Sequence, residues 1–165
     1  MRQCVKTKCW TGLLVLALVG GCASGPRSIQ NVSPSSKEQA KEKITGVGGV
    51  FIKARNPKEM AKWYRDHLGI DATRGYADFS WRDKEHPEHV GRTTWALFPT
   101  NTPYFRPSTA PFMINYRVAN LERMVEQLRR SGVTVDKVQD FNYGRFAWIT
   151  DPEGNRIELW EPKGE

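Results

Sequence analysis

A strand followed by a helix occurs twice in this chain, and the repeat limits the fold to a pair of similar modules. In the first copy the β-like run GVGGVFIKA precedes a helix predicted from Pro57, with Asn56 as its N-cap and Gly69 just past its end. In the second, PFMINYRV precedes a helix predicted from Leu121, which follows Asn120. Asn56 and Asn120 are 64 positions apart, and so are Met60 and Met124. Such a repeat predicts two copies of one supersecondary unit.

Further β-like segments complete each copy. They lie near YADFSW and TTWALF after the first helix, and RIELW ends the second copy. The sequence therefore predicts an α+β fold of two βαβββ modules in one domain, residues 44–163. Helical spacing predicts two buried faces, comprising Met60, Trp63, Tyr64 and Leu68 on the first helix and Met124, Val125 and Leu128 on the second.

The segment DPEGNRIELWEP indicates a turn followed by a strand that carries a carboxylate among apolar residues. Side chains alternate along a strand, so Arg156, Glu158 and Trp160 share one face. A carboxylate on the inner wall of a curved sheet is costly unless it meets a cation, a metal or hydrogen-bond donors. The pattern predicts either a site at Glu158 or a solvated edge strand with Glu158 in water.

The N-terminus predicts export. Residues 1–21 combine three cations with the short apolar run LLVLALVGG, which is typical of a signal peptide and too short to span a bilayer. VGGC, ending at Cys22, resembles the lipobox of bacterial lipoproteins, which implies acylation of Cys22 and, with Ala23 next, delivery to the outer membrane facing the periplasm. The alternative is an anchor helix with an incidental cysteine. Residues 22–43 are polar and predict a flexible tether.

Charge and cysteine content exclude two classes. The formal charge is +7, of which the signal's three cations supply +3, so +4 remains, interspersed with acids. This balance does not predict nucleic-acid binding. Cys4 and Cys9 lie within the signal, so the mature chain keeps only Cys22, without a disulfide framework.

With these segments, the chain resembles the vicinal oxygen chelate superfamily, also called the glyoxalase, bleomycin-resistance and dioxygenase superfamily. The resemblance rests on ITGVGGVFIKARNPKEMAKWYRDHLGI, FMINYRVANLERMVEQLRRSGV and DPEGNRIELWEP, and covers Ile44 to Pro162. It implies paired modules whose mixed sheet curves around a cavity, where the enzymes hold a divalent metal.

The metal positions implied by the resemblance contain one usable ligand. They correspond to Gly49, Ala96, Met113 and Glu158, and glycine, alanine and thioether side chains are poor ligands for hard divalent ions. We therefore expect no cofactor, with a divalent metal as the alternative. His67, His86 and His89 match no metal motif, and a solvated loop with a helix-capping His67 is the simpler interpretation.

Strand parity predicts what lines the cavity instead. Three cations, Lys53, Arg117 and Arg156, are predicted to surround the carboxylate of Glu158, which favours a small anionic or aromatic ligand. The alternative is a buried ion pair of Glu158 with Arg117 or Lys53 that only holds the modules in register. The predicted ligand-binding residues are Phe51, Lys53, Phe98, Asn115, Arg117, Arg156 and Trp160, with Tyr104, Tyr143 and Trp148 as further candidates.

Three functions remain open from the sequence. The first is a membrane-anchored protein that binds a small molecule without a metal. The second is a glyoxalase-type lyase, isomerase or dioxygenase, with Glu158 as catalytic base or metal ligand. The third is a cell-envelope interaction module with a closed core. The sequence is also compatible with a homodimer.

Overall fold

The computed structural model describes residues 40–84 and 86–164. The predicted signal peptide, the predicted lipidation site Cys22 and tether residues 22–39 lie outside the described residues. Within the described ranges, no helix is long and apolar enough to cross a membrane.

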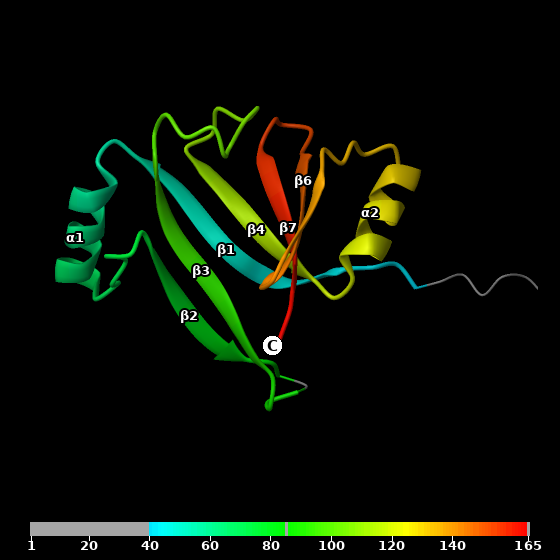
Figure 1. The fold of residues 1–165 in the computed structure, drawn as a ribbon, viewed down its shortest axis with the longest axis horizontal. Helices are drawn as coiled ribbons and strands as arrows, with labels where there is room; N and C mark the ends of the chain where they lie inside the picture. Colours follow the sequence, from blue (N-terminus) through cyan, green and yellow to red (C-terminus); the bar gives the residue numbers. More distant parts are fainter. Residues whose placement is uncertain (1–39, 85, 165) are drawn as a thin grey trace, which may run out of the picture. The chain divides into compact units, whose positions relative to one another are not determined.

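The described chain forms one seven-stranded mixed sheet with a helix on each flank (Figure 1). The strand order is β2-β3-β1-β4-β7-β6-β5. This arrangement confirms the predicted α+β fold. The elements are β1 (Ile44–Ala54), α1 (Pro57–Leu68), β2 (Tyr76–Arg82), β3 (Val90–Pro99), β4 (Phe112–Val118), α2 (Leu121–Arg130), β5 (Val138–Phe141), β6 (Gly144–Thr150) and β7 (Arg156–Pro162).

The sheet order reveals the two modules. β1 pairs in parallel with β3, and β4 pairs in parallel with β7, while β1 and β4 meet antiparallel at the centre. β2 and β6 occupy matching outer places in the order. The second module has the predicted βαβββ sequence of elements. In the described part of the first module, only β2 and β3 follow α1, so β5 has no counterpart there.

Both helices begin as the sequence predicts. The Asn56 side chain accepts a hydrogen bond from the Glu59 amide at 3.3 Å, and that of Asn120 accepts one from the Arg123 amide at 2.9 Å. Each bond satisfies an amide that has no partner within the helix. Gly69 ends α1 in the left-handed region, with φ of 68°, which an L side chain rarely adopts.

The buried face was predicted correctly for α2 but not for α1. Met124 and Val125 are each 5% exposed beneath α2, whereas Met60 is 39% and Trp63 50% exposed on α1. α1 instead buries Ala61, a small residue in the core cluster formed with Ala54, Ala72, Trp95 and Leu97, with Tyr64 partly buried at its margin. The contact stripe of α1 is therefore narrower than its apolar spacing predicts.

The two faces of the sheet carry different cores. One face of the sheet is covered by the helices. On this face, side chains of β1 and β3 pack under α1, and side chains of β4, β6 and β7 pack under α2. Tyr116, which alternates with Asn115 and Arg117 on β4, packs against the cluster under α2. The opposite face carries an aromatic cluster of Phe51, Phe105, Phe146, Trp148 and Trp160 with Ala96 and Met113. That inner face holds the site described below.

The end of the predicted tether is bound to α2 rather than free. The Glu42 amide donates to Oε1 of Gln127 at 2.8 Å, and Nε2 of Gln127 donates back to the Glu42 carbonyl at 3.1 Å. The Glu42 carboxylate accepts from the Asn120 amide at 3.2 Å and lies 3.6 Å from Nε of Arg123. Ala40 and Glu42 therefore contact α2 and its N-cap residue.

Candidate functional site

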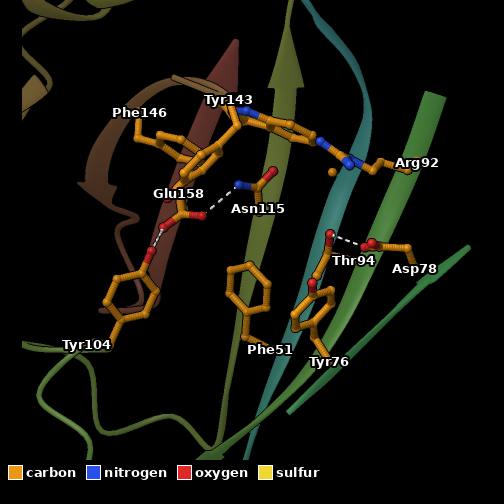
Figure 2. Close-up of a pocket in the computed structure, with 12 residues that line it drawn as sticks. Phe51, Tyr76, Asp78, Arg92, Thr94, Tyr104, Asn115, Tyr143, Phe146 and Glu158 are labelled. Atoms are coloured by element: carbon orange, nitrogen blue, oxygen red, sulfur yellow. Dashed lines mark hydrogen bonds between the residues drawn. The ribbon is translucent and has the colours of Figure 1, made fainter. Parts of the chain in front are cut away.

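A cavity of about 460 Å³ opens on the inner face of the sheet, between the two modules (Figure 2). Its wall is mainly aromatic, formed by Phe51, Tyr76, Tyr104, Tyr143, Phe146 and Trp160. The polar part of the wall comprises Asp78, Arg92, Thr94, Asn115 and Glu158, and Gly48 completes it. This size and mixture are typical of a small-molecule pocket.

A bulge in β1 shapes one wall of the cavity. The pairing of β1 with β4 shifts register between Val47 and Gly49, so Gly48 is the extra residue. A Cβ atom at Gly48 would lie 2.1 Å from Oδ1 of Asn115 and 2.8 Å from the Trp160 ring. Glycine at this position therefore allows Asn115 and Trp160 to pack against the backbone of β1.

Glu158 lies at the base of the cavity and is 1% exposed. Its Oε1 accepts a hydrogen bond from Nδ2 of Asn115 at 2.7 Å, and its Oε2 accepts from Nε1 of Trp148 at 2.8 Å and from the Tyr104 hydroxyl. The strands place these groups together, because Asn115 and Trp148 are the direct neighbours of Glu158 on β4 and β6. The solvated-strand alternative for Glu158 is therefore wrong.

Burial raises the pKa of the Glu158 carboxyl above its ordinary value, and the three hydrogen bonds from Tyr104, Asn115 and Trp148 oppose that rise. Burial and the charge of Glu158 likewise raise the pKa of the Tyr104 hydroxyl. All three donors to Glu158 are neutral. The carboxylate is thus held by an uncharged hydrogen-bond network, in place of the predicted alternative of an ion pair with Arg117 or Lys53.

The four positions implied for a family metal lie together at the centre of the sheet. They occupy two adjacent rows of cross-strand neighbours, one joining Ala96, Phe51 and Met113 and the other joining Gly49, Asn115 and Glu158. The family register predicted from sequence is thus consistent with the pairing of the strands.

Aromatic side chains fill the space around these positions. Met113 and Phe105 are fully buried in the same cluster as Phe51 and Ala96. A Cβ atom on Gly49 would lie 2.8 Å from the Phe51 ring, so even a larger side chain there would require Phe51 to move. Three positions without hard donors and an aromatic filling do not fit a divalent metal.

The histidines do not provide another metal centre. Nδ1 of His86 and Nε2 of His89 lie 3.4 and 3.8 Å from the same Glu88 oxygen on an exposed loop, and His67 packs its ring 5.0 Å from that of Trp63. The described residues contain no group of three or more His, Cys, Asp or Glu side chains that could hold a metal ion.

The structure brings Phe51, Asn115, Glu158 and Trp160 into the cavity wall, as predicted. Tyr104 and Tyr143 also line it, and Trp148 contributes through its hydrogen bond to Glu158. Phe98 does not line the cavity itself. Its ring stacks on the ring of Tyr104, with 5.4 Å between the centroids.

The three predicted cations do not line this cavity. Nζ of Lys53 lies 5.0 Å from the centre of the fully buried Phe105 ring, in a separate hollow beside Thr100 and Arg106, and the buried Arg156 pairs with Asp136. The Arg117 guanidinium lies 5.1 Å from the Trp160 ring centre, and Arg117 is not among the residues that line the cavity. An anionic ligand was expected because of these three cations, and none of them lines the cavity.

Sequence reasoning did not single out Tyr76, Asp78, Arg92 and Phe146. Arg92 lies two residues before Thr94 on β3, so its side chain is on the same face of the sheet. Asp78 on β2 is the direct neighbour of Thr94, whose hydroxyl donates to the Asp78 carboxylate at 2.7 Å. Arg92 could therefore have been found by parity, and Tyr76 and Asp78 from the register of β2 with β3, whereas Phe146 lies on β6. That register is not readable from the sequence, since the connection between the strands is long.

A family model matches residues 46–159, which include both modules and Glu158. It is described as the Glyoxalase/Bleomycin resistance protein/Dioxygenase superfamily. The chain belongs to this superfamily. The match spans β1 to β7 and agrees with the paired-module sheet, so the family expected from the sequence motifs is confirmed.

Solved structures of the superfamily share this fold. A variant of methylmalonyl-CoA epimerase from Streptomyces coelicolor, in complex with 2-nitronate-propionyl-CoA, is 17% identical over 74% of this chain and 100% of its own, with a TM-score of 0.54. A methylmalonyl-CoA epimerase in complex with methylmalonyl-CoA and NH4+ is 17% identical over 74% and 97%, with a TM-score of 0.53. These identities establish a common fold only. No curated protein matches the chain.

Proposed function

We propose that this domain binds one small molecule with an aromatic or apolar body in the central cavity, without the divalent metal of its enzymatic relatives. The observation that carries the proposal is a cavity of about 460 Å³ whose aromatic wall surrounds one buried carboxylate. A closed-core interaction module has no use for such a cavity. Aromatic rings supply most of the contact area that holds a planar ligand.

The proposal includes the predicted location. Acylation at Cys22 would anchor the domain to a membrane, in the outer membrane facing the periplasm, where a binding protein needs no cytoplasmic cofactor. Each buried methylene of an acyl chain contributes about 0.8 kcal/mol, so several chains hold the protein durably.

A fragment screen tests the proposal. Fluorinated fragments, in equal numbers of cationic, neutral and anionic aromatic compounds, are screened by ¹⁹F NMR against the full-length chain in nonionic detergent. Thr94→Phe places a ring into the cavity, whereas Thr134→Phe adds the same ring at an exposed position. We expect hits that bind the native chain and the Thr134 variant but not the Thr94 variant. An absence of hits, or hits indifferent to Thr94→Phe, would contradict the proposal.

A second candidate function is a metal-independent isomerase. It is favoured by the raised pKa of Glu158, since a carboxylate tuned upward by burial is a suitable general base near neutral pH. The solved epimerases of the same fold make this class a reasonable comparison. Glu158 would remove a proton next to a substrate carbonyl, and Tyr104 or Asn115 would lie beside the reacting group.

Deuterium exchange separates the two functions. Carbonyl compounds with an acidic C–H bond, methylmalonyl-CoA among them, are incubated with the full-length chain in D₂O and followed by mass spectrometry. Exchange that disappears in Glu158→Gln and persists in the exposed Glu122→Gln control would establish the isomerase. Binding without exchange would leave the binding function.

A further inference from the structure

One buried acceptor in the cavity has no hydrogen-bond partner. Asn115 is 2% exposed, and its Nδ2 donates to Glu158, which fixes the orientation of the amide. Oδ1 of Asn115 consequently points away from Glu158 and has no partner within the protein (Figure 2). A buried polar atom without a partner is costly, and such atoms are rare in folded proteins. A ligand that donates a hydrogen bond would satisfy this oxygen.

Gly48 allows Oδ1 of Asn115 to lie close against the backbone of β1 in the cavity wall. A Cβ atom at Gly48 would lie 2.1 Å from Oδ1 of Asn115, closer than any non-bonded contact. Gly48 lines the same cavity as Asn115. The unsatisfied oxygen and the missing side chain therefore occur at one place in the wall.

Glu158 supplies a second acceptor next to the first. A carboxylate offers about four lone-pair sites, and three are used by Tyr104, Asn115 and Trp148. A further donor would complete the set. A positive charge on that donor would also offset the cost of burying the carboxylate, which no cation in its hydrogen-bonding shell does.

The aromatic wall suits the same positive charge. Six of the residues that line the cavity are Phe, Tyr or Trp, and ring faces attract cations by about 0.5–2 kcal/mol each. We infer that the ligand carries a protonated amine, whose N–H groups donate to Oδ1 of Asn115 and to the Glu158 carboxylate, and an aromatic or apolar body that lies against the rings. This inference rests on the proposed binding function and specifies its ligand class.

The charges at the two ends of the cavity set the direction of the ligand. The Arg92 guanidinium enters the cavity from β3 and lies 5.8 Å from the Trp160 ring centre, while Tyr104 reaches Glu158 from the other end of the wall (Figure 2). Arg92 and Asp78 place opposite charges at one end of the cavity, whereas Glu158 at the other end is held by neutral donors only and attracts an ammonium group (Figure 2). The amine therefore lies at the Glu158 end, and the body of the ligand extends toward Arg92.

Three matched probes test the charge. 2-Phenylethylamine, 2-phenylethanol and 3-phenylpropionate share a ring and a similar chain, and present a cation, a neutral hydroxyl and an anion. Their binding to the full-length chain in nonionic detergent is measured by titration calorimetry against detergent blanks. We expect the amine to bind about tenfold or more tightly than the other two, because charge-assisted hydrogen bonds exceed neutral ones.

Two variants locate the effect. Asn115→Leu removes the free acceptor, and Glu158→Gln removes the charge and supplies an amide to which Asn115 can turn its oxygen. Both are expected to abolish the preference for the amine, whereas Asn101→Leu and Glu122→Gln, at exposed positions, retain it. Phenyltrimethylammonium, which has no N–H group, should bind more weakly than 2-phenylethylamine.

The outcomes separate this inference from the proposed function. If 2-phenylethanol or 3-phenylpropionate binds as tightly as the amine, and Thr94→Phe abolishes that binding, the amine inference is overturned and the binding function stands. If neither the probes nor the fragment screen shows binding in the cavity, both are overturned. A preference for the amine that survives Asn115→Leu and Glu158→Gln would place the amine elsewhere and also overturn the inference.

Discussion

The two modules have matching folds but contribute opposite chemistry to the cavity. Phe51 and Ala96 in the first module correspond, by sheet pairing, to Asn115 and Glu158 in the second. The first pair is apolar and belongs to the aromatic cluster, whereas the second pair forms the buried hydrogen-bond network. The difference shows that a symmetric scaffold does not require a symmetric site. The second half supplies the buried acceptors Asn115 and Glu158, whereas the polar residues of the first half, Asp78, Arg92 and Thr94, come from β2 and β3.

The two helices also differ, because α2 buries its apolar face and α1 leaves much of its own exposed. Matched substitutions on the two helices give the largest expected difference in stability. Met124→Ala removes a side chain that is 5% exposed under α2 and should lower the free energy of unfolding by about 2–5 kcal/mol. Met60→Ala, at the equivalent place on α1, is 39% exposed and should cost less than about 0.5 kcal/mol. Urea denaturation of both variants measures the difference. Equal losses would mean that α1 buries the face predicted from its sequence.

The polar pair of the second module is expected to matter for stability next. Glu158→Ala leaves Asn115, Trp148 and Tyr104 without their acceptor, and each buried unpaired donor costs about 1–3 kcal/mol. Glu158→Gln retains an acceptor for Trp148 and Tyr104 and should lose much less. Thermal denaturation at one pH compares the two variants. A loss in Glu158→Gln as large as in Glu158→Ala would indicate that the charge itself is required.

The raised pKa of Glu158 predicts a dependence on pH. A carboxyl whose pKa is higher in the folded state favours folding most when it is protonated, so its contribution falls as pH rises from its ordinary value of 4.5 through its folded value. The native chain should therefore lose stability relative to Glu158→Gln over the range of pH above 4.5, by about 1.4 kcal/mol per unit of pKa difference. Chemical denaturation across this range measures the trend. A difference that stays constant across this range would contradict the raised pKa.

The N-caps give the smallest contrast between modules. Asn56→Ala should cost about 1 kcal/mol, because Asn56 is the side-chain cap of α1. Asn120→Ala should cost less, since the Leu121 amide at the start of α2 also donates to Glu161 at 2.6 Å. Serine at either position is expected to restore most of the loss, measured by urea denaturation. A larger loss at Asn120 would contradict the support assigned to Glu161.

The repeat and the strand alternation predicted most of the fold and part of the site. The helix ends followed from Asn56, Asn120 and Gly69, because capping is local chemistry. Alternation along β7 correctly placed Glu158 and Trp160 on the inner face. These features depend on residues close in sequence, which is why a single sequence contains them.

The parts of the site that the sequence did not predict depend on contacts between side chains that are far apart in the sequence. Lys53 shares a face with Phe51, but its Nζ lies over the ring of the buried Phe105, from the connection between β3 and β4, and the residue lines a different hollow. Arg156 shares a face with Glu158 but turns to Asp136 from another element. Strand parity assigns a side chain to a face and says nothing about these distant partners. The predicted positive cavity therefore became an aromatic one with its acceptors at Glu158 and Asn115.

The bonds between Glu42 and α2 have a mechanical consequence. If acylated Cys22 anchors the chain, as proposed, any pull along residues 23–39 reaches the domain at Glu42 before it reaches β1. The paired hydrogen bonds between Glu42 and Gln127, with the contacts to Asn120 and Arg123, then carry that force first. β1 carries Gly48 and Phe51, so this clamp isolates the wall of the cavity from tension at the membrane.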